Sequence, residues 1–173
     1  MNLLSDRILN MSTSATLEMA AKARELRAEG KDIIGLSLGE PDFNTPDYIK
    51  AAAIQAINDN YSSYTPVDGY VELKDAIIKK FNRDNGLTYN RNQIVVSTGA
   101  KQSLANVAAI LINKDDEVII PCPYWVSYAD LVKLNDGIPV EVPTTIATDF
   151  KMTPEQLEAA ITPKTKMLWY SSP

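Results

Sequence analysis

The second half of the sequence alternates short apolar runs with helical patterns, and this alternation limits the possible fold more than any other feature. Amphipathic helical spacing separates four expected strands, at 93–96, 117–120, 138–142 and 166–170. Strands connected through helices run in the same direction and form a parallel sheet. We therefore expect an α/β fold in which a largely parallel sheet carries helices on both faces.

The first half adds helices and one more strand. Residues 1–13 show no clean period and are expected to form an arm. A helix is expected from residue 14 to Gly30, where glycine favours a helix end. Residues 33–38 then predict a short strand, and a turn-rich loop follows at 39–44.

Local signals set the ends of several helices. Thr45, followed by Pro46 and Asp47, predicts an N-cap and a helix that continues to about residue 59. A further helix is expected to end at Gly86. The sequence of residues 153–156 is a capping box, and a proline break is expected at 121–123, after the second of the four strands.

Composition and charge exclude several classes of protein. The chain of 173 residues has 17 basic and 22 acidic residues and a net charge of −5, which argues against binding to nucleic acid. No apolar run is long enough to span a membrane and no secretory signal is seen, so a cytoplasmic protein is predicted. The absence of histidine removes Ser–His and Cys–His nucleophile pairs and most zinc sites. The single cysteine, Cys122, cannot form a metal site by itself, and no metal is expected.

The segment of residues 97–103 is the strongest candidate for a ligand site. A strand is expected to turn into a helix through Gly99, and the first turn of a helix offers backbone N–H groups and a positive dipole end. A phosphate group would be held there, with Lys101 as a further donor. An ordinary strand-to-helix turn explains the same seven residues. The glycine patterns of dinucleotide and nucleoside triphosphate loops are absent.

Ligands of parallel sheets bind beyond the carboxyl ends of the strands. Gly99 and Trp125 both follow expected strand ends, so they are expected to face one pocket.

Four short motifs together indicate a family. They are Gly39-Glu40-Pro41-Asp42-Phe43, Tyr64 with Gly69, Gly99-Ala100-Lys101-Gln102, and Pro123-Tyr124-Trp125. In this order and at these separations, they resemble the amino-terminal part of class I (fold-type I) pyridoxal-phosphate aminotransferases of the bacterial aspartate aminotransferase kind. The resemblance covers essentially the whole chain.

The resemblance implies a cofactor site for pyridoxal 5′-phosphate (PLP). Gly99, Ala100 and Lys101 correspond to the turn that binds the cofactor phosphate. Trp125 resembles the aromatic residue that stacks on the pyridine ring and lies at the substrate. A tryptophan in the core after a strand is the alternative for Trp125.

The resemblance also implies a substrate site and a dimer. Gly39 matches the glycine whose backbone lies against the substrate carboxylate, although a plain turn glycine needs no ligand. Tyr64 resembles the tyrosine that reaches the cofactor phosphate of the neighbouring subunit, so a homodimer with shared active sites is implied. Read without the family, Tyr64 is one of eight tyrosines.

The implied activity is transfer of an amino group from an amino acid, with L-aspartate the expected donor, to a 2-oxo acid such as 2-oxoglutarate through a pyridoxamine intermediate. The Schiff-base lysine of the family is expected beyond Pro173, so the chain is expected to be a truncated, amino-terminal fragment and inactive alone. The family divides it into an arm at 1–13, part of a small domain at 14–45, and the first part of the PLP-binding domain at 46–173.

Three alternatives remain open. Another fold-type I PLP enzyme, such as a lyase, shares the phosphate and ring contacts. A non-enzymatic, aminotransferase-like sensor domain is a second alternative, which the acidic charge disfavours. A nucleotide-binding α/β domain is the third, and the missing glycine patterns argue against it.

Overall fold

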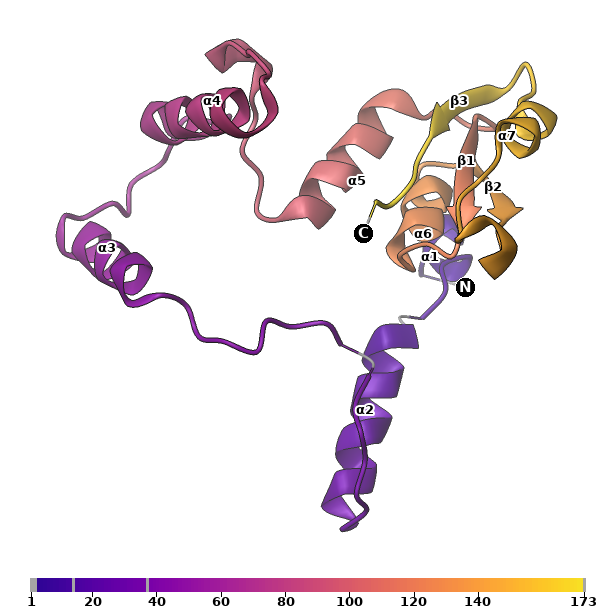
Figure 1. Cartoon of the computed structure of the whole chain (residues 1–173), viewed down its shortest axis with the longest axis horizontal. Coiled ribbons are helices and arrows are strands. Elements are labelled where there is room, and N and C mark those ends of the chain that lie inside the picture. Colours follow the sequence, from indigo (N-terminus) through magenta and orange to yellow (C-terminus); the bar gives the residue numbers. More distant parts are fainter. Residues whose placement is uncertain (1–2, 14, 37, 173) are drawn as a thin grey trace. The chain divides into compact units, whose positions relative to one another are not determined.

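The computed structural model describes residues 3–13, 15–36 and 38–172. The described residues divide between two compact units, one within 39–103 and one within 1–38 and 104–173, which we call the sheet unit, and each is described separately below. The helices and strands, labelled in Figure 1, are α1 (Asp6–Leu9), α2 (Ala15–Ala28), α3 (Asp47–Asn58), α4 (Val71–Asn85), the 3-10 helix η1 (Arg91–Gln93), α5 (Ala100–Leu111), β1 (Glu117–Cys122), α6 (Ser127–Leu134), β2 (Ile138–Pro143), the 3-10 helix η2 (Ile146–Thr148), α7 (Pro154–Ala160) and β3 (Thr165–Leu168).

Three parallel strands form the sheet, in the order β2-β1-β3. β1 pairs with β2 along its whole length, from Glu117 opposite Ile138 to Cys122 opposite Pro143. Its pairing with β3 is shorter and shifts register after Glu117. The parallel sheet expected from the alternating sequence is therefore confirmed for the strands that follow residue 116.

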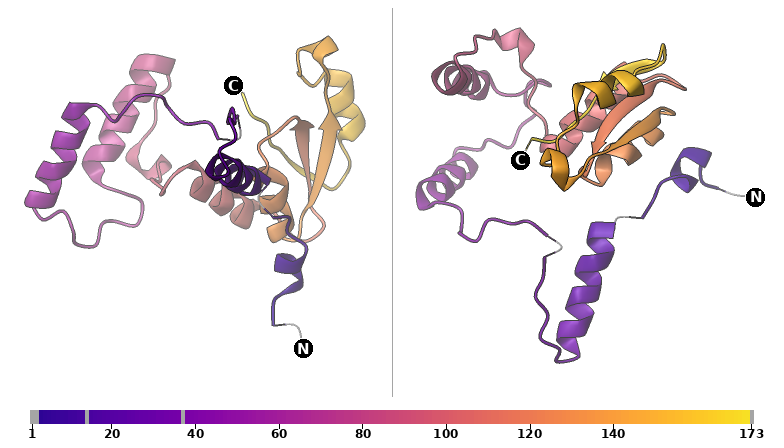
Figure 2. Two further views of the ribbon diagram at one scale, coloured as in Figure 1. Left: turned by 90° about the horizontal axis from the view of Figure 1, so that it is seen from below. Right: turned by 45° about the vertical axis from the view of Figure 1, so that its right-hand side comes forward.

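The core of the unit that contains the sheet lies around β1. Val118, Ile119 and Ile120 are three consecutive buried residues, although successive side chains of a strand point to opposite faces. Both faces of β1 are thus covered. α5 contributes Ala108 to this core and α6 contributes Val132. α6 packs against β1 and β2, and α7 packs against β2 (Figure 2).

Several local predictions are confirmed. The capping box at the start of α7 forms both of its hydrogen bonds: Gln156 N–H donates to Thr153 Oγ1 at 3.2 Å, and Thr153 N–H donates to Gln156 Oε1 at 2.9 Å. α4 ends at Gly86, which adopts a left-handed conformation with φ +67°. Gly30, with φ +80°, follows the end of α2.

Two predicted strands are wrong. Residues 33–36 and 38 form no strand, and residue 37 lies outside the described residues. The strand expected at 93–96 is also absent: Gln93 ends η1, and residues 94–96 pair with no described strand, although Ile94 is extended (φ −123°, ψ 127°). Apolar β-branched runs favour the extended conformation, but a strand exists only where a neighbouring strand accepts its hydrogen bonds, and in the described residues all ladder pairs join β1, β2 and β3.

Two predicted boundaries also change. α3 begins one residue later than expected, with Pro46 instead of Thr45 as N-cap, because the first helical hydrogen bonds run to the Pro46 carbonyl. β1 continues through Pro121 to Cys122 instead of breaking. Pairing with β3 reaches only as far as Ile119, so the missing N–H of Pro121 is not needed on that side.

The amino-terminal segment lies against the sheet unit. α1 packs on α6, and the Ser12 hydroxyl donates to both carboxylate oxygens of Asp130, at 2.9 and 3.0 Å. The domain boundaries implied by the family resemblance stay a prediction. Among the described residues, none of the helices has the length and apolarity that crossing a lipid bilayer requires.

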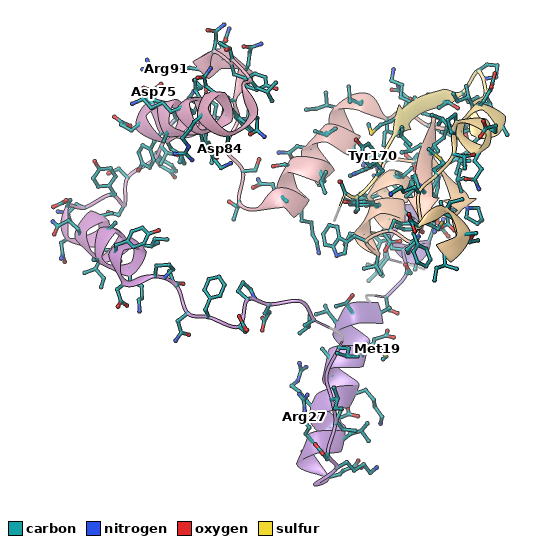
Figure 3. The ribbon with its side chains drawn as sticks, in the orientation of Figure 1. Met19, Arg27, Asp75, Asp84, Arg91 and Tyr170 are labelled. Atoms are coloured by element: carbon teal, nitrogen blue, oxygen red, sulfur yellow. The ribbon has the colours of Figure 1, made fainter. Side chains whose placement is uncertain are left out.

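The unit of residues 39–103 is mostly helical. α4 is linked to η1 by Arg91, whose Nε and Nη2 atoms donate to the two carboxylate oxygens of Asp75 at 2.6 and 2.5 Å (Figure 3). The Arg91 guanidinium holds the pKa of the Asp75 carboxyl below its ordinary value of 3.8. This ion pair fixes the loop that precedes the predicted phosphate turn.

Candidate functional site

The predicted phosphate turn is formed by the main chain before α5. Gly99 has φ +84°, a conformation that side-chain-bearing residues rarely adopt, whereas a Cβ there would meet no atom within 4 Å. The first hydrogen bond of the helix runs from Ser103 N–H to the Gly99 carbonyl at 3.4 Å. The N–H groups of the helical turn before Ser103 therefore precede the intrahelical hydrogen bonds and lie at the positive end of a 12-residue helix.

The side chains of the turn divide into two roles. Gln102 Oε1 accepts a hydrogen bond from Thr98 N–H at 2.5 Å, so its amide closes the turn. Ala100 and Lys101 are exposed at the helix start. An exposed helix N-terminus beside a lysine is suited to a phosphate group, and the phosphate of PLP fits these donors chemically.

The segment that leads into the turn is held by a buried lysine that sequence analysis missed. Lys74 is 5% exposed and its ammonium group forms an ion pair with Asp68, whose backbone carbonyl accepts a hydrogen bond from Val96 N–H at 3.1 Å. The hydrogen bond from Lys74 holds the pKa of the Asp68 carboxyl below its ordinary value. A Cβ on Gly69 (φ +99°) would lie 2.7 Å from Val96 Cγ2. The loop containing Asp68 thereby fixes the extended chain just before the turn.

Gly39 and Tyr64 belong to the same unit as the turn but lie on separate loops. Gly39 follows residue 38 in the loop before α3, and a Cβ there would meet no atom within 4 Å. Tyr64 lies between α3 and α4 and is fully exposed. Contacts within the described chain give neither residue a structural role, so their assignment to substrate and to a partner subunit stays a prediction.

Trp125 belongs to the other unit, in the short connection between β1 and α6. Trp125 is 39% exposed and lies outside the buried core formed by the described residues, so its role at a cofactor stays a prediction. The Trp125 carbonyl accepts a hydrogen bond from Tyr128 N–H at 2.9 Å, and the two rings meet at 87° with centroids 5.7 Å apart. A large, flat and accessible indole fits the stacking surface that the ring of PLP requires.

Two ionisable groups near Trp125 are kept neutral. Tyr124 OH donates to Glu141 Oε1 at 2.5 Å, and burial followed by this hydrogen bond raises the pKa of the phenol. Burial, and then the charge of Glu141, raises the pKa of the Cys122 thiol. The environment at the end of β1 thus favours a protonated hydroxyl and an unreactive thiol.

Sequence analysis missed the aromatic neighbours of Trp125. Tyr128 and Trp169 stack on each other with centroids 5.0 Å apart and an interplanar angle of 22°. The spacing of three residues between Trp125 and Tyr128 was the available signal, because residues three apart meet across a tight turn such as the one that precedes α6. Trp169 follows β3, and its position beside Tyr128 depends on the pairing of β3 with β1.

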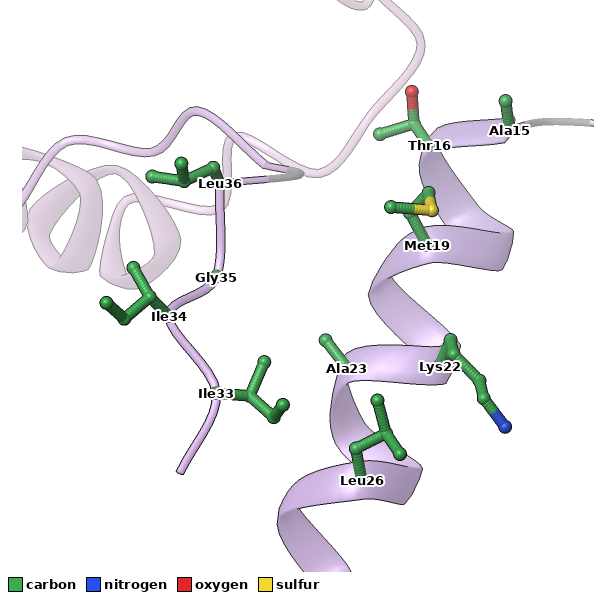
Figure 4. A pocket seen from close by; sticks show the side chains of 10 residues that line it. All are labelled: Ala15, Thr16, Met19, Lys22, Ala23, Leu26, Ile33, Ile34, Gly35 and Leu36. Atoms are coloured by element: carbon green, nitrogen blue, oxygen red, sulfur yellow. The ribbon is translucent and has the colours of Figure 1, made fainter. Parts of the chain in front are cut away.

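The described chain also has an apolar groove of about 460 Å³ between α2 and residues 33–36. Figure 4 shows Met19, Ala23 and Leu26 of α2 on one side, with Ile33 opposite. The Arg27 side chain joins the two sides by donating to the Ile33 carbonyl at 3.0 Å. The predicted site residues do not line this groove.

The sequence matches a family model over most of its length. Residues 31–173 match the model described as aminotransferase class I and II. The chain belongs to the class I and II aminotransferases. The family expectation from the four motifs is confirmed, together with the α/β fold of PLP-dependent aspartate aminotransferases.

Individual class I and II aminotransferases show the same relationship. The chain is 55% identical over all of its length to an aspartate/prephenate aminotransferase of Cereibacter sphaeroides, and covers 43% of that protein. It is 51% identical, over 98% of its length, to an aspartate aminotransferase of Geobacillus stearothermophilus, again covering 43%. The chain therefore spans less than half the length of these relatives.

Solved aminotransferase structures have the same fold. The aspartate aminotransferase of Thermus thermophilus with maleate gives a TM-score of 0.92 at 43% identity, with 97% of this chain and 44% of that one covered. The aspartate aminotransferase of Rhizobium meliloti gives 0.91 at 45% identity, with 96% and 42% covered.

Proposed function

We propose that the protein containing this chain is a PLP-dependent aminotransferase that transfers the amino group of L-aspartate to a 2-oxo acid such as 2-oxoglutarate. The observation that carries this proposal is that the chain is 55% identical, over its whole length, to an aspartate/prephenate aminotransferase. The alternatives of a lyase, a sensor domain and a nucleotide-binding domain have no comparable support.

The residues of the turn before α5 would hold the cofactor phosphate. The main-chain N–H groups after Gly99 supply hydrogen bonds, and the Lys101 ammonium supplies a positive charge. The left-handed conformation of Gly99 aims this helix end at one point, and the loop of Asp68 keeps the preceding chain in place. When bound, PLP withdraws electrons from the α-carbon of the amino acid.

The other predicted residues would orient the ring and the substrate. Trp125 offers its indole to the pyridine ring and the substrate, and Gly39 lets the backbone approach the substrate carboxylate without a side chain between them. Tyr64 would reach the cofactor phosphate of the partner subunit, which requires a homodimer with shared sites. We assign the covalent PLP-binding role to none of the lysines of residues 1–173, and we assign Lys101 to the phosphate.

The proposed protein acts on small amino acids and oxo acids in the cytoplasm. The acidic balance of 17 basic against 22 acidic residues supports the absence of a nucleic-acid partner. Relatives in Cereibacter sphaeroides and Nitrosomonas europaea carry prephenate in their names, so prephenate is the second oxo acid to test as an acceptor.

The test is an absorption spectrum of the full-length protein with PLP, before and after addition of L-aspartate without any oxo acid. We expect a band of protein-bound cofactor that changes to that of the aminated cofactor and returns when 2-oxoglutarate is added. A band that does not respond to L-aspartate rejects the donor, and a missing band rejects the cofactor.

The phosphate assignment has its own variant. Lys101→Ala should weaken PLP binding by roughly tenfold or more, because a charge-assisted hydrogen bond contributes about 1.5–3 kcal/mol. Lys151→Ala removes an exposed lysine of the sheet unit and should leave the dissociation constant unchanged. Equal affinities of the Lys101 variant and the wild type would remove Lys101 from the phosphate site.

A further inference from the structure

Four aromatic side chains gather where β1 and β3 end, and Tyr128 contacts the other three. Its ring centroid lies 5.7 Å from that of Trp125, 5.0 Å from that of Trp169 and 6.4 Å from that of Tyr124. The rings of Trp169 and Tyr124 are nearly parallel to that of Tyr128, at 22° and 9°, whereas Trp125 meets it at 87°. Tyr128 is thus the shared ring of the group.

The sheet core holds Tyr128 in place. Trp169 is only 7% exposed, and its backbone N–H donates to the Ile119 carbonyl of the central strand at 2.9 Å. Tyr128 lies on α6 beside the buried Ala129, and its ring packs against the core. The Tyr128 hydroxyl lies 3.0 Å from Ser171 Oγ, at hydrogen-bonding distance. Both the ring and the hydroxyl are therefore fixed by residues on the β3 side of the sheet.

Trp125 is 39% exposed, and the supported Tyr128 ring contacts it edge-on. A large exposed side chain samples several rotamers, and a ligand that needs one of them must restrict the others on binding. A perpendicular ring contact is a favoured aromatic geometry and restricts the plane of the indole. The Tyr128 N–H bond to the Trp125 carbonyl fixes the backbone of the same residue.

We propose that Tyr128 is a positioning residue that holds the Trp125 indole in the orientation needed to stack on the PLP ring. This inference rests on the proposed function. Tyr128 would not touch the reacting atoms itself, and it would act by ordering Trp125 before the cofactor arrives. The order of support runs from the buried Trp169, through Tyr128, to the exposed Trp125.

The first test compares two variants of the full-length protein by PLP affinity. Tyr128→Leu removes the ring and should raise the dissociation constant for PLP by roughly threefold to tenfold, the range expected for one aromatic pair. Tyr128→Phe keeps the ring and loses only the hydroxyl, so it should restore most of the affinity. Tyr48→Leu makes the same chemical change at an exposed position of α3 and serves as the control.

A double-mutant cycle separates positioning from general destabilisation. If Tyr128 acts through Trp125, Tyr128→Leu should lower affinity in the wild type but have little further effect in a Trp125→Leu background. Independent losses that add in the double variant would overturn the inference. So would an unchanged affinity of Tyr128→Leu in a protein whose Trp125→Leu variant binds weakly.

A readout without cofactor measures the orientation directly. The near-ultraviolet circular dichroism of Trp125 is the difference between the spectra of the wild type and Trp125→Phe in the PLP-free protein. This signal should fall in Tyr128→Leu and persist in Tyr128→Phe, and a signal that persists in both variants would overturn the positioning role. Failure of the wild-type protein to bind PLP would reject both proposals, whereas a bound cofactor with an unaffected Tyr128→Leu variant rejects this one alone.

Discussion

The sheet and the helices of residues 39–103 are stabilised in different ways. β1 supplies three consecutive buried apolar residues, and α5 and α6 close over them. α3, which the structure describes completely, has no buried residue, and its Ile54 and Ile57 are 60% and 75% exposed. The buried residue of α4 is Lys74, held by an ion pair. In the described residues the sheet unit therefore has the larger apolar core, whereas ion pairs of α4 and two aromatic pairs, Tyr61–Tyr70 and Phe81–Tyr89, link the elements of the other unit.

The largest expected effect contrasts one isoleucine from each region. In the polypeptide of residues 1–173, Ile120→Ala should lower the free energy of unfolding by about 2–5 kcal/mol, because it leaves a cavity in a fully buried site. Ile57→Ala should change it by no more than about 0.5 kcal/mol. Urea unfolding, followed by the combined fluorescence of Trp125 and the buried Trp169, measures both. Equal losses would show that α3 is buried and would break the comparison.

A pair of glycines should show the same contrast with a smaller effect. A Cβ on Gly137 would lie 2.6 Å from Ile112 Cγ2 and 3.2 Å from the Asp116 carbonyl oxygen, so Gly137→Ala should cost about 1–3 kcal/mol and Gly137→Asn more. At Gly86 a Cβ meets nothing, and the left-handed φ alone makes Ala unfavourable, by about 1–2 kcal/mol.

Asn tolerates the left-handed conformation, so Gly86→Asn should cost less than Gly86→Ala. Thermal unfolding of the four glycine variants tests this reversal of order. If Asn destabilises the protein more than Ala does at both sites, close packing limits both regions and the contrast is lost.

The smallest expected effect is the response of the ion pairs to acid. The folded pKa of Asp75 is lowered by Arg91, so its contribution to stability is complete above the ordinary value of 3.8 and is lost as pH falls through the lowered pKa. The link between α4 and η1 should therefore weaken below about pH 4.

Asp75→Asn should reduce the loss of stability over that pH range, measured by circular dichroism during acid titration. Asp149→Asn, at an exposed residue 3.6 Å from Lys151 on the sheet unit, is the matched control. Identical acid profiles for the wild type and the Asp75 variant would show that this ion pair does not contribute to stability over that pH range.

Sequence reasoning succeeded where neighbours along the chain decide the structure. The capping box of α7, the glycine end of α4 and the alternation of β1, α6 and β2 depend on residues a few positions apart. Reasoning failed for the strands expected at 33–38 and 93–96, because a strand needs a partner that no local pattern can supply.

Among the features of the candidate site, those set by local sequence were predictable and those set by distant contacts were not. The glycine turn before α5 was predictable, because a helix N-terminus and a left-handed glycine are local features. The ion pair of Lys74 with Asp68 was not predicted, because a lysine in a helical pattern reads as exposed. The exposure of Trp125 in the described chain could not be predicted from the sequence either, since a tryptophan after a strand is as readily buried as accessible.

The sequence by itself determined the family of this chain, its alternating strands and helices, and the turn suited to a phosphate. These follow from short motifs and from the periods of apolar residues. Only the tertiary structure decided that Tyr128 links the exposed Trp125 to the buried Trp169. The physical reason is that residues 128 and 169 meet through the pairing of β3 with β1, a contact between distant segments that local periodicity does not encode.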